Sequence, residues 1–323
     1  MKPNKETALK VSRELLNGKS ITIVDVGARN KTWELPGIAS LCDVYGFEPN
    51  VVEYDKMIVN KTDLELVVKD LKDLPYRSIQ YIDKALSNRE GTSAFNITRG
   101  PGACSLLEPN TDMITQMEYY TPRTKKFPPQ FEIEKKQITQ VTTLDKVAEF
   151  TKIDSIDYLK LDTQGNELDI LHGAKNLFSE NRVGVIKSEV EFQELYKHQG
   201  FFSDIDAFLR SQGFTLLNIE FDARHRVIWS KERIRWDKGT LLFGDAYYAL
   251  SLQTHSNLSE TQVIRHALVL SELGFIDYAI ALLNRAKSMP SESRDFLISY
   301  WKADNRTWKR KIKHWLERRF FNG

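Results

Sequence analysis

The stretch Asp157-Tyr-Leu-Lys-Leu-Asp-Thr-Gln-Gly-Asn-Glu-Leu-Asp-Ile-Leu-His-Gly-Ala174 decides the fold of this chain. Its apolar beginning stops at Asp162, a turn with Gly165 follows, and leucines at helical spacing come next. This order predicts a buried strand that ends in a carboxylate and is followed directly by a helix. Because ligands of open α/β sheets bind at the carboxyl ends of the strands, Asp162 is placed for chemistry.

The composition is that of an ordinary globular protein. The chain has 323 residues, of which 41% are hydrophobic and 28% charged, so a large core can form. A net charge of +2 predicts neither a nucleic-acid partner nor a site for acidic substrates. The two cysteines, Cys42 and Cys104, are too few for a metal cluster and argue against a disulfide framework. The polar N-terminus and the lack of a long apolar run favour a cytoplasmic protein.

Strands and helices alternate over the first three quarters of the sequence. A turn at 88–91 is expected to pair the strand 92–97 with the strand before it as a hairpin. The alternation favours an α/β fold with a doubly wound, mainly parallel sheet. The strands are expected at 21–26, 43–48, 78–86, 92–97, 136–142, 158–161, 182–192, 214–219 and 241–243.

Two segments depart from this pattern. Residues 99–135 contain several prolines and little periodicity, which is typical of a functional loop or lid, with a disordered insertion as the alternative. Residues 261–288 read as a helical hairpin similar to one tetratricopeptide repeat, and a single repeat makes no solenoid. We therefore expect a catalytic domain at 1–243 and a helical C-terminal extension at 244–323.

The C-terminal residues 308–321 have the pattern of a basic amphipathic helix. Two tryptophans and other apolar residues share one face, while lysines and arginines occupy the rest. Such a helix can lie on an anionic membrane surface, here the inner face of the membrane. The alternative is a terminal helix that packs on the hairpin and keeps its charges in water. The sequence does not predict the oligomeric state.

The first two strands end in residues suited to a nucleoside-containing cofactor. Gly27 lets the backbone approach a ligand, and Asp25 can accept hydrogen bonds. Glu48 follows about 20 residues later, where an acid can bind both hydroxyls of a ribose. No further glycine occurs before Gly37, so the turn is poorly built for a pyrophosphate. S-adenosylmethionine therefore fits better than NAD.

Six motifs between residues 20 and 220 occur in one characteristic order. They are Asp25-Val-Gly-Ala-Arg29, Gly46-Phe-Glu-Pro-Asn50, Ala85-Leu-Ser-Asn-Arg-Glu-Gly91, Thr143-Leu-Asp145, Leu159–Ala174 and Phe201–Leu209. In this order they resemble the FkbM family of S-adenosylmethionine-dependent methyltransferases. The resemblance implies the class I methyltransferase fold, a Rossmann-like seven-stranded sheet with one antiparallel strand. It also implies O-methylation, as in natural-product or surface-polysaccharide biosynthesis.

The resemblance also assigns cofactor contacts. Asp25 and Gly27 are expected near the methionine part, and Glu48 on the ribose. Ala85 and Leu86 are expected near the adenine. The remaining predicted cofactor contacts are Arg29, Asn50 and Asp162. The chain departs from many relatives at Asn30 and Lys31, where they carry a further glycine.

The candidate catalytic groups are acids at the ends of two strands that we expect to be neighbours. Glu189 and Glu191 alternate on one strand and so share a face, with Asp162 on the next strand. A sugar hydroxyl is a poor acid, so its methylation needs a base, a metal ion or both. The three carboxylates would suit Mg²⁺ or another divalent cation. A structural ion network with Lys160 or Lys187 is the alternative.

His198 is a further candidate for the general base, because it follows that strand closely. A lone histidine in a loop is more often a surface residue. The leading hypothesis is a methyltransferase that acts on a hydroxyl of a sugar or glycan precursor. One alternative is an NAD-linked oxidoreductase or sugar-nucleotide enzyme, but such an enzyme needs a glycine-rich phosphate turn. The other is a non-catalytic binding protein, which does not explain why Asp25 and Glu48 stand at successive strand ends.

Overall fold

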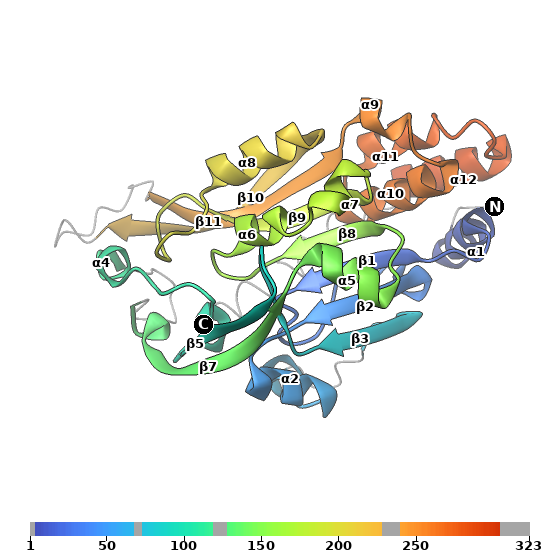
Figure 1. The fold of residues 1–323 in the computed structure, drawn as a ribbon. Coiled ribbons are helices and arrows are strands. Elements are labelled where there is room, and N and C mark those ends of the chain that lie inside the picture. Colours follow the sequence, from blue (N-terminus) through green and yellow to red (C-terminus); the bar gives the residue numbers. More distant parts are fainter. Residues whose placement is uncertain (1–3, 68–72, 119–127, 228–239, 304–323) are drawn as a thin grey trace.

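A twisted, mainly parallel sheet runs through the centre of the protein (Figure 1). The computed structural model describes residues 4–67, 73–118, 128–227 and 240–303. The strands lie in the order β3-β2-β1-β8-β9-β11-β10, and β11 is antiparallel to both of its neighbours. A two-residue strand, β6 (Met117–Glu118), extends the edge. The seven main strands are β1 (Ile21–Val26), β2 (Cys42–Phe47), β3 (Ser78–Ile82), β8 (Ile156–Leu161), β9 (Val183–Glu191), β10 (Phe214–Val227) and β11 (Thr240–Leu250).

This order, with one antiparallel strand beside the last, is that of the class I methyltransferase fold, as the resemblance implied. The central strands are buried on both faces, so their sequences are apolar runs rather than alternating patterns. Parallel pairing of β1 with β2 and β8 brings the carboxyl ends of these strands to one edge. Asp162, directly after β8, therefore lies at the same edge of the sheet as the ends of β1 and β2, as predicted.

A second, three-stranded sheet corrects two of the expectations. The predicted strand 78–86 is divided, because β3 ends at Ile82 and β4 (Ala85–Leu86) pairs instead with β7 (Ile133–Thr142). Strand β5 (Gly91–Thr98) also pairs with β7, in antiparallel fashion, and not with the preceding strand as a hairpin. The turn at 88–91 is a local signal and cannot specify a partner about 40 residues away. Strand β5 therefore pairs with β7 instead of with the strand before the turn.

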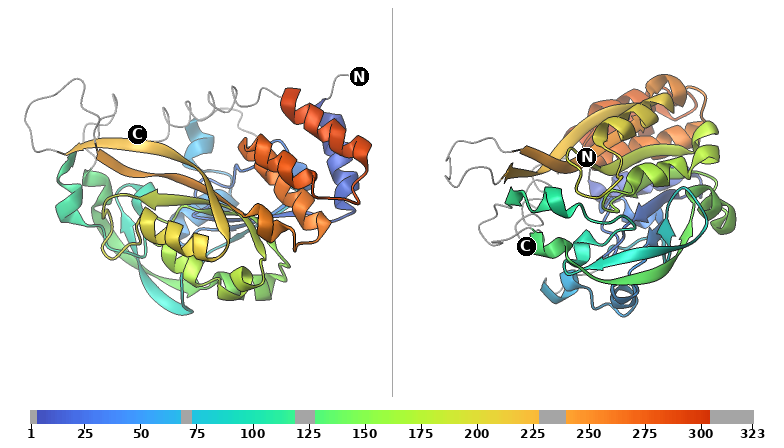
Figure 2. Two further views of the ribbon diagram at one scale, coloured as in Figure 1. Left: turned by 90° about the horizontal axis from the view of Figure 1, so that it is seen from above. Right: turned by 60° about the vertical axis from the view of Figure 1, so that its left-hand side comes forward.

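Helices cover both faces of the central sheet (Figure 2). On one face lie α5 (Leu144–Thr151), α6 (Glu167–His172), α7 (Lys175–Ser179) and α8 (Phe202–Ser211). The other face is covered by α1 (Lys5–Leu16), α10 (Glu260–Leu273), α11 (Ile276–Leu283) and α12 (Ser291–Ala303). The shorter helices are α2 (Val51–Ile58), α3 (Asp63–Val67), α4 (Thr111–Ile114) and α9 (Leu252–His255), with 3-10 turns at Ala39–Leu41, Pro101–Ala103 and Pro128–Phe131.

The C-terminal helices are part of the core rather than an appendage. Helix α10 is buried at ten consecutive residues, 263–272, and shares a hydrophobic cluster with β1, β8 and α1. A helix that is buried on all sides must lie between other elements. Strand β11 continues to Leu250, so the predicted boundary at 243 falls inside a strand of the sheet. The sequence predicted the helical hairpin but not the elements against which α10 packs.

A buried polar cluster ties α10 to the start of β8. The Asp157 carboxylate is fully buried and accepts hydrogen bonds from Arg265 Nε and from the backbone N–H of Thr22, both at 2.8 Å. His266 Nε2 lies 3.3 Å from the same carboxylate, an approach without hydrogen-bond geometry. The other ring nitrogen of His266 lies 3.0 Å from His255. The cluster holds sheet and helix in one register.

No helix within the described ranges is long and apolar enough to cross a membrane. The predicted basic amphipathic helix at 308–321 lies outside the described residues, so its contact with a membrane surface or with the hairpin stays a prediction.

Candidate functional site

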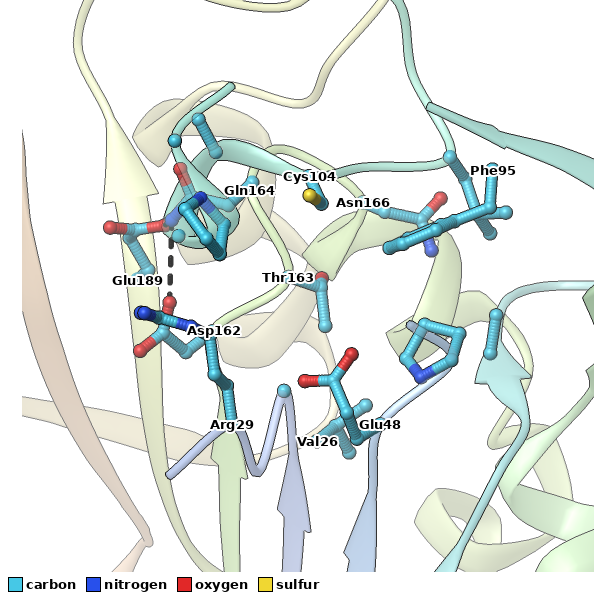
Figure 3. A pocket seen from close by; sticks show the side chains of 18 of the residues that line it. Val26, Arg29, Glu48, Phe95, Cys104, Asp162, Thr163, Gln164, Asn166 and Glu189 are labelled. Carbon is cyan, nitrogen blue, oxygen red and sulfur yellow. Dashed lines mark hydrogen bonds between the residues drawn. The ribbon is translucent and has the colours of Figure 1, made fainter. Parts of the chain in front are cut away.

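A cavity of about 720 Å³ opens at the carboxyl ends of β1, β2, β8 and β9 (Figure 3). The second sheet forms one wall through Ala85, Leu86 and Phe95. Residues 99–104 and 129–131 form another, so described parts of the segment predicted as a functional loop do line the site. Lys187, Glu189 and Glu191 of β9 and Asp245 of β11 line the far end. The walls of the cavity therefore differ in chemical character from one part to another.

Gly27 allows the ends of β1 and β8 to come into close contact. Its φ is +85°, a conformation that favours glycine. A Cβ atom at this position would lie 1.9 Å from the carbonyl oxygen of Asp162. The two strand ends are also joined by a hydrogen bond of 3.0 Å from the Asp162 N–H to the Val26 carbonyl. The floor of the cavity is thus built from close-packed backbone that a larger residue would push apart.

The loop after Gly27 is held by ion pairs instead of by a second glycine. Asn30 and Lys31 both have a positive φ, of 65° and 68°. The resemblance led us to expect a glycine in this loop, and the backbone at both positions has the conformation that glycine favours. The buried Lys31 ammonium group contacts Glu65 at 2.6 Å and Asp73 at 2.8 Å. These ion pairs hold the loop in that conformation.

Arg29 lines the cavity, as predicted for a cofactor contact, but its guanidinium is tied to α2 and α3. It contacts Glu53 at 3.0 Å and Asp63 at 2.8 Å. Asn50 does not line the cavity. Its side-chain oxygen instead accepts from the backbone N–H of Val52, which makes it the N-cap of α2. Asn50 thus positions the helix that follows Glu48, and its predicted cofactor contact is replaced by this capping role.

Asp25 lies beneath the cavity rather than in its wall. Its carboxylate accepts a hydrogen bond from Thr32 Oγ1 at 2.7 Å and pairs with Lys160 Nζ at 3.1 Å. Burial raises the pKa of Asp25, although Lys160 acts in the other direction. Burial alone would lower the pKa of Lys160, but the carboxylates of Asp25 and Asp162 raise it above its usual value. Lys160 therefore lines the cavity, and Asp25 holds its ammonium group in place.

Glu48 presents its carboxyl group to the cavity from the end of β2 (Figure 3). The residue is 5% exposed, and one carboxylate oxygen accepts the backbone N–H of Asn50 at 2.8 Å. Burial raises the pKa of Glu48 to about 7. A carboxyl group with this pKa becomes ionised near neutral pH when a ligand supplies hydrogen-bond donors.

Asn166 joins Ala85, Leu86 and Phe95 at the same end of the cavity, as Figure 3 shows for Asn166 and Phe95. Its Nδ2 donates to the carbonyl of Leu86 at 2.8 Å, which ties the β8–α6 turn to β4. The sequence reasoning did not single out Asn166. Its position in the turn directly after Asp162 is the feature of the sequence that could have identified it as a site residue. This end combines apolar walls with a side-chain amide, a suitable setting for a flat heteroaromatic ring.

Gln164 bridges Asp162 and Glu189 on the opposite side of the cavity (Figure 3). Its Nε2 donates to Glu189 at 2.6 Å and lies 3.4 Å from Asp162 Oδ1. Its Oε1 accepts from the hydroxyl of the buried Tyr196 at 3.1 Å. Gln164 has a φ of +62°, so the turn holds it in a strained conformation. Sequence reasoning missed this bridge, although Gln164 stands in the decisive stretch.

Burial raises the pKa of Glu189 and of Glu191 well above the usual value, and neighbouring carboxylates add to the effect. Lys187 lies on the same strand and is paired with Asp245 at 3.1 Å, not with either glutamate. The predicted ion network of the two glutamates with these lysines is therefore not found, because Lys160 pairs with Asp25 and Asp162, and Lys187 with Asp245. Within the described residues, Glu189 and Glu191 form no ion pair with either lysine.

Two predicted roles are not supported by the geometry. Across the described parts of the chain, no three or more carboxylate, histidine or cysteine side chains are grouped so that they could hold a metal ion. The predicted metal site of Asp162, Glu189 and Glu191 is thus not formed, because Gln164 lies between the first two. His198 is exposed, does not line the cavity and has a positive φ of 65°. This position outside the cavity lends no support to the predicted role of His198 as the base.

The fold and the cavity together define an α/β enzyme of the class I methyltransferase type, with its site at the carboxyl ends of the sheet. The chain belongs to the FkbM methyltransferase family, because the model of the methyltransferase FkbM domain matches residues 25–216. This membership makes it an S-adenosylmethionine-dependent methyltransferase. No curated protein matches the sequence.

A comparison with solved structures finds other methyltransferases, at low sequence identity and low TM-score. One is magnesium protoporphyrin IX methyltransferase from Synechocystis PCC 6803 with bound S-adenosylmethionine, at 10% identity and a TM-score of 0.32, covering 76% of this chain and 79% of that one. Another is a putative tRNA (m1A22) methyltransferase from Streptococcus pneumoniae, at 10% identity and a TM-score of 0.30, covering 91% and 98%. A third is an rRNA methylase from Streptococcus thermophilus, at 10% identity and a TM-score of 0.30, covering 76% and 96%.

Proposed function

We propose that this methyltransferase moves a methyl group from S-adenosylmethionine to a hydroxyl group of a sugar, in a glycan or natural-product precursor. The observation that carries the proposal is the arrangement of Glu48 and Glu189 at opposite sides of one cavity, with Asp162 between them. When bound, the cofactor supplies an electrophilic methyl group on a sulfonium. The remaining work, which is to place a hydroxyl group and to remove its proton, falls to side chains of the chain itself.

The residues present fit this cofactor. The Glu48 carboxyl group suits a ribose diol, and the apolar walls of Leu86 and Phe95 suit an adenine ring. The glycine at position 27 lets the end of β1 pack directly on the Asp162 backbone, and both residues line the floor on which the middle part of the cofactor would rest. The Asp162 carboxylate gives this region the negative charge that a sulfonium needs. The methionine end would then meet Lys160, which Asp25 supports from below.

Glu189 is the group best suited to take the proton. Its pKa lies above the usual value of a carboxyl group because it is buried, and a stronger base is a better match to a weakly acidic hydroxyl. Gln164 fixes one of its oxygens at 2.6 Å, which leaves the carboxyl group in a defined orientation. Asp162 is more exposed, and its carboxylate lies 3.5 Å from the Lys160 ammonium group, an arrangement that suits an electrostatic role. A base of this kind needs no metal ion.

The pKa of Glu48 makes cofactor affinity dependent on pH. The diol binds the ionised carboxylate, so binding should strengthen as the pH rises through about 7 and should release a proton. Between pH 6 and pH 8 the ionised fraction of such a group grows about tenfold, and we expect about a tenfold gain in affinity for S-adenosylhomocysteine. Calorimetry in buffers of different ionisation enthalpy measures both effects. In Glu48→Gln the affinity should be weak at every pH, and a persisting tenfold gain would assign the titration to another group.

Replacing Glu189 with glutamine should separate transfer from cofactor binding. We expect methyl transfer to fall about 100-fold or more, the range lost with a general base, while the affinity for S-adenosylhomocysteine stays within about twofold. Transfer is measured with methyl-labelled cofactor on a panel of sugar nucleotides and glycan precursors. The control is Glu149→Gln, at an exposed position on α5 away from the cavity. Full activity in Glu189→Gln would remove Glu189 as the base.

The same assay tests the metal alternative. Since the described carboxylates form no group that could hold a divalent cation, we expect EDTA to leave the transfer rate unchanged. Loss of activity in EDTA that added Mg²⁺ restores would return Asp162 and its neighbours to the role of metal ligands. The two non-methyltransferase alternatives are set aside by family membership. A cytoplasmic location, a glycan partner and contact of 308–321 with a membrane stay predictions.

A further inference from the structure

One carboxyl oxygen in the cavity has no hydrogen-bond partner. Glu191 is 1% exposed and lines the cavity at the end of β9. Its Oε2 is buried, and no donor among the described residues reaches it. A buried polar atom left without a partner costs about 1–3 kcal/mol, so such an atom is kept where a ligand later satisfies it. The stability of the protein alone gives no reason to retain a glutamate here.

The pairing of β9 with β11 concentrates acidic groups around this oxygen. Glu189 lies directly opposite Asp245, and Glu191 lies opposite Phe243. Like charges directly opposite each other destabilise an antiparallel pair. Asp245 is offset by Lys187 at 3.1 Å, but this pairing leaves the two glutamates unneutralised. This end of the cavity therefore has an excess of hydrogen-bond acceptors over donors.

The surroundings select the kind of ligand that can supply the donors. A phosphate or carboxylate group would meet Glu189 and Glu191, the two glutamates that Lys187 leaves unneutralised, and be repelled. An ammonium group would suit the acids but would enter beside the Lys187 and Lys160 ammonium groups, which also line the cavity. Different hydroxyl groups of one neutral ligand can donate to Glu191 and accept from Lys187. The walls at Leu195 and Phe243 are apolar and suit the carbon face of a ring.

We infer that the β9–β11 end of the cavity is the acceptor subsite, and that it takes a neutral polyhydroxylated ring. In it Glu191 accepts a hydrogen bond from a hydroxyl group next to the one that Glu189 deprotonates. The two side chains are two residues apart on one strand and share a face, which sets them at a spacing suited to neighbouring hydroxyl groups. The inference rests on the proposed function, since it assumes that Glu189 faces the reacting hydroxyl. Glu191 is thus a binding residue for the acceptor, with a role distinct from the base.

The subsite can be tested with simple sugars, by saturation-transfer NMR on protein loaded with S-adenosylhomocysteine. The neutral probes are the methyl α-glycosides of glucose, galactose and mannose, and the charged probes are glucosamine and glucose 1-phosphate. We expect saturation transfer to at least one neutral glycoside and at least a fivefold weaker signal from both charged probes. In Glu191→Leu the signal should disappear, while the affinity for S-adenosylhomocysteine stays within twofold. The control variant is Glu149→Leu, which should keep the signal.

Thermal unfolding separates this role from a structural one. Because Glu191→Leu removes an unsatisfied buried carboxyl group, its midpoint should equal or exceed that of the wild type, whereas loss of a structural contact would lower it. If the leucine variant does not fold, Glu191→Met provides the same test with a side chain of nearly the same length. A lower midpoint in both folded variants would contradict the inference.

The remaining outcomes of the NMR experiment also test the inference. A signal that survives in Glu191→Leu or Glu191→Met overturns the role of Glu191. Charged probes that bind as well as neutral ones, or neutral glycosides that give no signal on cofactor-loaded wild type, overturn the class of acceptor. In those cases binding of S-adenosylhomocysteine leaves the methyltransferase assignment standing. Failure of S-adenosylhomocysteine itself to bind would instead count against the proposed function.

Discussion

Replacing Gly27 with alanine should abolish cofactor binding and destabilise the protein by about 3 kcal/mol or more. The new Cβ atom would lie 1.9 Å from the Asp162 carbonyl oxygen, well inside contact distance. Neither partner can move easily. The Gly27 N–H is bonded to the Phe47 carbonyl and the Asp162 N–H to the Val26 carbonyl, both at 3.0 Å. Relief of the clash would therefore separate β1 from β8 at the floor of the cavity.

Gly18 provides a matched control for this substitution. It has nearly the same backbone conformation, with a φ of +80° against +85° for Gly27, but a Cβ atom there would meet nothing within 4 Å. Gly18→Ala should cost only about 1 kcal/mol, the strain of a left-handed alanine, and should bind S-adenosylhomocysteine normally. Urea unfolding and calorimetry on both variants measure the difference. Equal losses in the two would show that the close approach of the strands does not matter.

Replacing Asp157 with alanine should cost about 3–5 kcal/mol of stability, because it leaves a buried charge without its partner. Arg265 is 9% exposed at its side chain and bonds the Asp157 carboxylate at 2.8 Å. The same change removes the acceptor for the buried N–H of Thr22. Since α10 is held to β8 by these bonds, the C-terminal helices should lose protection from hydrogen exchange together with the strand.

The surface pair of Lys146 with Glu149 is the control for this effect. Its atoms are 2.7 Å apart, yet the two side chains are 48% and 68% exposed, and exposed pairs of this kind add little to stability. Denaturant unfolding should therefore separate Asp157→Ala clearly from Glu149→Ala. A loss below about 1 kcal/mol in Asp157→Ala would mean that the helices do not depend on the cluster and behave as the appendage that the sequence first suggested.

The sequence located the site well because each apolar run that ends in an acid marks the carboxyl end of a strand. Glu48, Asp162 and Glu189 were found in this way, and the structure brings them to one cavity. The strand alternation predicted the doubly wound sheet for the same reason: periodicity is a local property of the chain. The family resemblance, carried by the order of the motifs, also predicted the one antiparallel strand, which no local pattern specifies.

What could not be predicted depends on contacts between distant parts of the chain. Asp25 looked like a ligand contact, but its partner Lys160 lies opposite it in the register of β1 and β8, about 130 residues away. The pairing of β5 with β7 and the packing of α10 on the sheet are non-local in the same sense. Gln164 was overlooked because a glutamine in a turn is ordinary until Glu189 is seen beside it.

Calorimetric titration of the purified protein with S-adenosylmethionine, S-adenosylhomocysteine and NAD measures which cofactor the cavity binds. We expect both sulfur compounds to bind at one site and NAD not to bind. In Glu48→Ala the affinity should fall about tenfold or more, because hydrogen bonds to the ribose are lost. Binding of NAD, or no binding of either sulfur compound to a folded wild-type protein, would contradict the account.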